Sequence, residues 1–195
     1  LPYAIPGFIS ILIWKGLLNT NFGIVNKILA GTFGIQPIPW FESVFWTRFA
    51  CVLVNLWLGF PYSMMLITGI LQGIPNEIYE AATVDGASSF QKFRFITVPL
   101  VLFSVAPLLI MSFAHNFNNF NIIYLLNDGN PAVFGQQGKA GGSDILISWV
   151  YKLTFEALKF NFAAAMSIII FLLIVGFSIY NYTRTRSFRE EDMLR

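Results

Sequence analysis

Apolar runs of membrane-spanning length alternate with polar connections along this 195-residue chain. A helix that crosses the hydrocarbon core of a bilayer needs roughly 17 to 25 mainly apolar residues. Runs of this kind lie at about residues 2–18, 49–71, 95–117 and 162–182. Lys15 interrupts the first run, and Pro2 and Pro6 lie near its start. The pattern predicts an all-α polytopic membrane protein with four transmembrane helices in one domain over residues 1–195.

The connections between these runs differ in composition. Residues 19–48 mix Gly, Pro, Trp and Phe, which is typical of an interfacial segment with short helices. Residues 127–160 begin with a stretch rich in Gly and Pro. Ile145, Trp149 and Leu153 then repeat at helical spacing, so we expect a helix on the membrane surface. Residues 183–195 form a polar tail.

Composition supports the membrane class. The chain is 56% hydrophobic and 11% charged, and its mean hydropathy is +0.66, which is too apolar for an ordinary soluble domain. A net charge of +2 gives no footprint for nucleic acid. One cysteine and one histidine exclude a metal site built on several such ligands, and no catalytic triad is evident. Because the chain begins at Leu1 without a basic leader, we expect a piece of a larger protein.

The polar connection at 74–100 carries helix start and stop signals. Pro75 and Asn76 can begin a short helix, and Gly86 can end it in a left-handed conformation. Ser88 and Gln91 have the spacing of a capping box for a second helix that leads into the third run. The sequence therefore predicts a helix-turn-helix between two membrane helices. It could dock on a soluble partner, or it could be an ordinary solvated loop.

The same connection resembles a known motif. Glu80-Ala81-Ala82, followed by Gly86, Ile96 and Pro99-Leu100, resembles the EAA loop of permease subunits from ATP-driven (ABC) importers. Four further stretches resemble the larger membrane subunit of maltose importers, the MalF type: LPYAIPGFIS, NLWLGFPY at 55–62, SFAHNFNNFN at 112–121 and NDGNPA after it. The resemblance covers nearly all of the chain, although members of the family carry further spans before this point.

The resemblance implies a MetI-like permease fold in the inner membrane of a prokaryote. It implies that loop 74–100 faces the cytoplasm and docks on an ATP-binding cassette ATPase dimer through Glu80, Ala81, Ala82 and Gly86. Loops 19–48 and 127–160 would then lie at the outer face. The other implied partners are a second permease subunit, an extracytoplasmic sugar-binding protein and membrane lipid. ATP and Mg would be bound by the ATPase, with no cofactor in this chain.

Polar residues interrupt the third apolar run at helical spacing. Ser112, His115, Asn116 and Asn119 follow the i, i+3, i+4, i+7 pattern of one helix face. A neighbouring stripe of aromatic residues consists of Phe113, Phe117, Phe120 and Tyr124. Amides and hydroxyls suit sugar hydroxyl groups, and aromatic rings suit the apolar faces of pyranose rings. We therefore expect a sugar site near the middle of the membrane.

The first and second runs offer similar faces, with Tyr3, Gly7 and Ser10 in one and Asn55, Gly59 and Tyr62 in the other. Residue spacing and the resemblance together give the predicted substrate contacts: Tyr3, Gly7, Asn55, Leu58, Gly59, Tyr62, Ser112, His115, Asn116 and Asn119. Where the resemblance leads us to expect Phe and Ser, the chain has His115 and Gly7; both differences argue against maltose itself and leave a related oligosaccharide open. Alternatively, the amides bond across helices as packing contacts.

We interpret the chain as a non-enzymatic transport subunit that moves maltose-like or maltodextrin-like oligosaccharides by alternating access. An importer for another sugar or small solute fits the same features. An ion-coupled carrier would place charges inside the spans, and Lys15 is the one candidate; His115 could serve as a proton relay. A membrane-embedded enzyme would show clustered His or acidic residues. A purely structural subunit would tolerate leucine on the polar faces.

Overall fold

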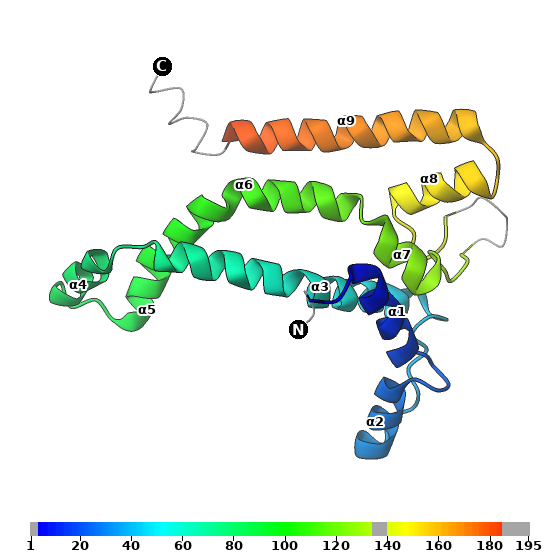
Figure 1. The fold of residues 1–195 in the computed structure, drawn as a ribbon, viewed down its shortest axis with the longest axis horizontal. Coiled ribbons are helices and arrows are strands. Elements are labelled where there is room, and N and C mark those ends of the chain that lie inside the picture. Colours follow the sequence, from blue (N-terminus) through cyan, green and yellow to red (C-terminus); the bar gives the residue numbers. More distant parts are fainter. Residues whose placement is uncertain (1–3, 134–139, 185–195) are drawn as a thin grey trace. The chain divides into compact units, whose positions relative to one another are not determined.

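Figure 1 shows the chain as a computed structural model, which describes residues 4–133 and 140–184. The regular elements in these two ranges are helical. In chain order they are α1 (Gly7–Leu17), α2 (Ile24–Phe33), α3 (Val44–Gln72), α4 (Asn76–Val84), α5 (Ser89–Lys92), the π-helical turn η2 (Phe93–Thr97), α6 (Val98–Phe117), α7 (Phe120–Asn127), α8 (Leu146–Phe155) and α9 (Phe160–Arg184).

Three helical stretches of the described chain are long and apolar enough to cross a membrane: Val44–Gln72, Ser89–Asn127 and Phe160–Thr183. They contain the predicted runs at 49–71, 95–117 and 162–182. The second stretch joins α5, η2, α6 and α7. The expectation of a multi-spanning helical protein is thereby confirmed for these three runs.

The first predicted span is shorter than expected. Its helix, α1, has 11 residues, roughly 16 Å at 1.5 Å per residue, against a hydrocarbon core of about 30 Å. Pro6 precedes the helix. Beyond its C-terminus, Asn19 Oδ1 accepts hydrogen bonds from the backbone N–H groups of Asn21 and Phe22 and so folds the chain into a turn. The start of the predicted span, including Tyr3, lies outside the described residues.

The connection after α1 contains a short helix, as predicted, and is held by one buried amide. Asn26 on α2 is 4% exposed. Its Nδ2 donates to the carbonyl oxygens of Thr20 and Ile38. Its Oδ1 accepts from the Ile38 backbone N–H and from Trp40 Nε1. A single side chain therefore fixes the path of residues 20–40.

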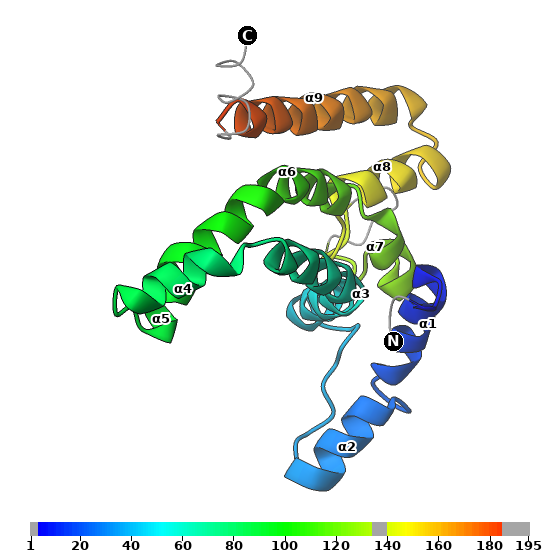
Figure 2. The ribbon, with the colours of Figure 1, turned by 60° about the vertical axis from the view of Figure 1, so that its left-hand side comes forward.

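Helix contacts divide the chain into two compact units, which we describe separately. The first unit comprises residues 1–60 and 115–174, and the second comprises residues 61–114 and 175–195. In the first unit α1 packs against α7, and Ile11, Leu18, Val54 and Leu126 belong to its core. Figure 2 shows α1 beside α7 from a second direction. The second unit contains α4, α5 and η2. These elements, the turns that join them and the first residues of α6 make up residues 74–100, which we call the coupling segment.

Candidate functional site

Three of the predicted amides meet in the first unit. Asn55 on α3 donates from Nδ2 to Asn116 Oδ1 at 2.7 Å. Asn55 Oδ1 accepts from Asn119 Nδ2 at 3.1 Å. Asn55 and Asn119 are half-buried, and Asn116 is exposed. We call Asn55, Asn116 and Asn119 the amide cluster.

The amide cluster is not built on one continuous helix face, contrary to the prediction. Helix α6 ends at Phe117, and Asn119 is the residue before α7, with φ −77° and ψ 69°. Two backbone hydrogen bonds between residues three positions apart bridge the break. Asn118 N donates to the His115 carbonyl and Asn119 N donates to the Asn116 carbonyl, both at 3.2 Å. Asn119 therefore reaches Asn55 from a turn between two helices.

The hydrogen bonds of the cluster fit the packing alternative, because they join α3 to the end of α6 and the start of α7. They also leave capacity for a ligand. A primary amide has two N–H donors and two carbonyl lone pairs, and Asn55 uses one of each within the cluster. The arrangement is uncharged and offers both donors and acceptors, which suits hydroxyl groups.

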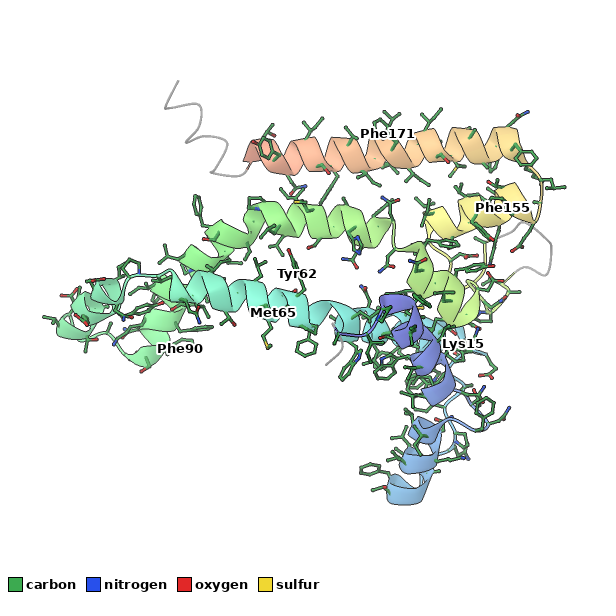
Figure 3. All side chains as sticks on the ribbon, viewed as in Figure 1. Lys15, Tyr62, Met65, Phe90, Phe155 and Phe171 are labelled. Carbon is green, nitrogen blue, oxygen red and sulfur yellow. The ribbon has the colours of Figure 1, made fainter. Side chains whose placement is uncertain are left out.

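The remaining predicted contacts are distributed over both units. Gly7 and Gly59 lie in the first unit, and a Cβ added at either glycine would meet no atom within 4 Å. His115 is exposed, and Leu58 packs against the core of this unit. Tyr62, which is 47% exposed, and Ser112 belong to the second unit. Figure 3 shows Tyr62 on α3, and Tyr3 lies outside the described residues.

The coupling segment has the local structure that the sequence predicts. Pro75 precedes α4, and Gly86 takes a left-handed φ of 77° after it. Ser88 and Gln91 form the capping box: Gln91 N donates to Ser88 Oγ at 3.3 Å, and Ser88 N donates to Gln91 Oε1 at 2.7 Å. Each of these three features was expected from residue type and spacing.

Two side-chain hydrogen bonds join α4 to the start of the membrane-length stretch Ser89–Asn127. The hydroxyls of Tyr79 and Thr97 share a hydrogen bond of 2.9 Å. Lys92 Nζ donates to Thr83 Oγ1 at 2.6 Å. Thr97 closes η2, a π-helical turn of a kind often found at functional sites. These two bonds tie α4 to residues 92–97, which lead into α6, and the sequence pattern did not predict them.

The coupling segment has an open surface. No residue of α4 is buried. Glu80, Ala81 and Gly86 are exposed, and Ala82 is half-buried. Val84 is 88% exposed, and Phe90, labelled in Figure 3, is 73% exposed. The coupling segment therefore leaves both apolar and charged side chains uncovered.

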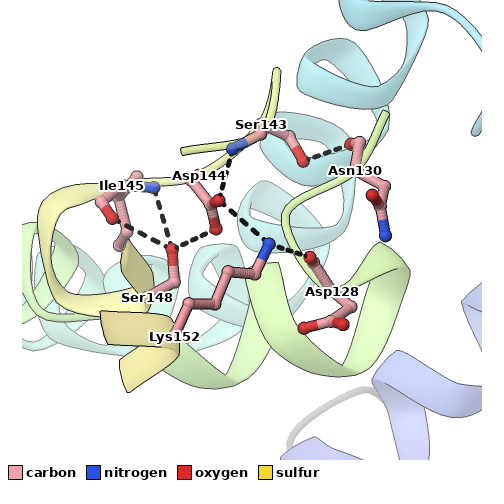
Figure 4. A network of polar contacts seen from close by, with 8 residues as sticks. Asp128, Asn130, Ser143, Asp144, Ile145, Ser148 and Lys152 are labelled. Carbon is pink, nitrogen blue, oxygen red and sulfur yellow. Dashed lines mark hydrogen bonds and ion pairs between the residues drawn. The ribbon is translucent and has the colours of Figure 1, made fainter. Parts of the chain in front are cut away.

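A polar network on the first unit holds the connection between α7 and α8 (Figure 4). Lys152 Nζ lies 3.0 Å from Asp144 Oδ2 and donates to the Asp128 carbonyl at 2.5 Å. Ser148 Oγ donates to Asp144 Oδ1 at 2.8 Å. The predicted helix at 145–153 is confirmed as α8, with its Lys152 face buried. That it lies on the membrane surface stays a prediction.

Metal coordination has no support within the described ranges, where no three His, Cys, Asp or Glu side chains gather. The geometry is instead that of a helical membrane protein with an uncharged polar cluster and an open helix-turn-helix.

Comparison with known proteins identifies the class. Residues 1–188 match the family described as "Binding-protein-dependent transport system inner membrane component". The chain belongs to this family, and it is a multi-pass inner-membrane permease component and not an enzyme. The resemblance to permeases of binding-protein-dependent importers is thereby confirmed.

The relatives that the chain matches include sugar permeases. It is 49% identical, over 98% of its length and 45% of the relative, to the galactooligosaccharides transport system permease protein GanP of Bacillus subtilis (strain 168). It is 41% identical, over 99% of its length and 46% of the relative, to the maltodextrin permease MdxF of the same strain. It is 46% identical to the maltose/maltodextrin permease MalF of Escherichia coli (strain K12), over 95% of the chain and 37% of the relative. The chain thus spans less than half the length of these relatives.

A solved structure shares the fold. A bacterial ABC transporter involved in the import of the acidic polysaccharide alginate matches with a TM-score of 0.81 at 22% identity, over 95% of this chain and 62% of that chain. The MetI-like permease fold is thereby confirmed.

Proposed function

We propose that this chain is part of the membrane-spanning subunit of an ATP-driven importer and lines the path of a neutral oligosaccharide. The observation that carries the proposal is the amide cluster, in which Asn55 of α3, Asn116 of α6 and Asn119 of the turn before α7 come together. Amides bind hydroxyl groups without requiring a charge on the substrate. The other predicted contacts, Tyr3, Gly7, Leu58, Gly59, Tyr62, Ser112 and His115, would complete this path.

The relatives narrow the class of substrate. The names of GanP and MdxF refer to galactooligosaccharides and maltodextrins, both neutral oligosaccharides. The higher identity to GanP adds galactooligosaccharides to the maltose-like substrates that the sequence suggested. Uptake measurements with both classes decide between them.

The coupling segment would receive the ATPase. Its open face, with Glu80 exposed and Val84 88% exposed, suits docking in a groove of an ATP-binding cassette dimer, which binds ATP and Mg. The Tyr79–Thr97 and Thr83–Lys92 bonds would pass the movement of α4 to α6. A second permease subunit and an extracytoplasmic binding protein would complete the importer, and alternating access would move the sugar.

The test uses the full-length subunit with its partners in proteoliposomes and labelled maltodextrins and galactooligosaccharides. Asn55→Leu and Glu80→Lys should each lower ATP-driven uptake by about tenfold or more. The two variants should differ in their binding of the ATPase. Glu80→Lys should lose the ATPase during purification, and Asn55→Leu should retain it. Lys27→Glu, a charge reversal at an exposed residue of α2, is the matched control.

Uptake that needs no ATP and ignores both substitutions would overturn the proposal and favour an ion-coupled carrier. Full uptake by Asn55→Leu with ATP coupling intact would show that the amides are packing contacts.

A further inference from the structure

Four aromatic rings form a continuous series on α7 and α8. Phe120 and Tyr124 stack with centroids 4.9 Å apart, and Tyr151 lies 4.9 Å from Phe120 and 5.0 Å from Tyr124. Phe155 continues the series at 4.8 Å from Tyr151. We call these four residues the aromatic ladder.

The aromatic ladder lies on a face that the core does not use. Helix α7 buries Ile122, Ile123 and Leu126, and α8 buries Val150 and Leu153. Phe120, Tyr124 and Tyr151 are only half-buried, and Phe155, labelled in Figure 3, is 65% exposed. Each helix thus places its aliphatic side chains in the protein and leaves aromatic surface outward.

The aromatic ladder begins in the chain directly after the amide cluster. Phe120 directly follows Asn119, whose amide donates to Asn55. Helix α8 connects the second membrane-length stretch, Ser89–Asn127, to the last one, whereas α4 precedes the second stretch. Connections at opposite ends of a spanning helix lie on opposite sides of the membrane. With α4 toward the ATPase, the ladder lies on the side from which substrate arrives.

We propose that the aromatic ladder is a stacking surface for the second and later pyranose rings of an incoming neutral oligosaccharide whose first ring binds at the amide cluster. This inference rests on the proposed function. The apolar C–H face of a pyranose packs on an aromatic ring, and the hydroxyls of Tyr124 and Tyr151 can bond to sugar hydroxyls.

The inference predicts an effect that depends on chain length. In proteoliposomes with the complete importer and saturating loaded binding protein, initial uptake rates are compared for a disaccharide and a hexasaccharide of the transported class. Phe155→Ala and Tyr151→Leu should lower the hexasaccharide rate by about five- to tenfold and leave the disaccharide rate within about twofold. Tyr151→Phe keeps the ring and should retain most of the hexasaccharide rate.

The matched control is Phe22→Ala. Phe22 belongs to the same unit, is 65% exposed like Phe155, and lies outside the ladder. An unchanged hexasaccharide-to-disaccharide ratio in Phe155→Ala and Tyr151→Leu would overturn the inference, and so would an equal change in Phe22→Ala. Failure of the wild-type importer to take up the disaccharide with ATP would instead overturn the proposed function.

Discussion

The two compact units satisfy their polar groups in different ways. In the first unit, hydrogen bonds join residues far apart in the chain: Asn55 reaches Asn116 and Asn119 across 61 and 64 positions, and Arg48 reaches the Gly142 carbonyl across 94. In the coupling segment, the bond between Tyr79 and Thr97 spans 18 positions. The capping box spans three.

This difference in the sequence separation of hydrogen-bonded residues shows which interactions determine the geometry of each region. The amide cluster exists only while distant helices are held together, so a movement of α3 against α6 and α7 would change it. The coupling segment is set by its own sequence and can keep its shape while it moves.

Removing the buried cation of the first unit should have the largest effect on stability. Lys152→Met leaves Asp144, whose side chain is 1% exposed, without its cation. Breaking a buried pair in this way costs about 3–5 kcal/mol. Thermal unfolding in detergent should show a clearly lowered midpoint, with faster proteolysis between α7 and α8.

Lys159→Met is the control, because Lys159 is exposed and directly precedes α9. A surface change of this kind usually stays within about 0.5 kcal/mol. If both variants unfolded alike, the network in Figure 4 would not hold this region.

A change at Gly86 should have an intermediate effect confined to the second unit. At φ 77° an alanine is strained by roughly 1–2 kcal/mol. Gly86→Ala should weaken binding of the ATPase by about tenfold, measured by titration in nanodiscs. Gly86→Asn, which tolerates the left-handed region better, should recover part of the affinity. Equal affinity for all three proteins would show that this turn does not position α4.

This contrast also explains what the sequence could predict. Gly86 and the Ser88–Gln91 capping box were predictable because a cap or a left-handed turn depends on residues a few positions apart. The three long apolar runs were predictable from composition. The Lys152–Asp144 pair was not, since neither residue has a local signal for burial.

The break between α6 and α7 shows a second limit. Ser112, His115, Asn116 and Asn119 fit one helical face on paper, but the helix ends at Phe117. The aromatic stripe divides at the same point: Phe113 pairs with Phe177 in the second unit, and Phe120 stacks on Tyr124 in the first. Periodicity placed these residues on one face and did not locate the turn that separates them.

The capping box offers the smallest and most local test. Ser88→Ala removes the oxygen that accepts from Gln91 N and should destabilise the start of α5 by about 1 kcal/mol. Amide hydrogen exchange near residues 89–92 should then be about fivefold faster, with exchange in α3 and α7 unchanged. Ser89→Ala serves as the control, because Ser89 is the first residue of α5 and its replacement removes a hydroxyl but leaves the Ser88 cap in place. Faster exchange that extended to α7 would contradict the view that the coupling segment is set by its own sequence.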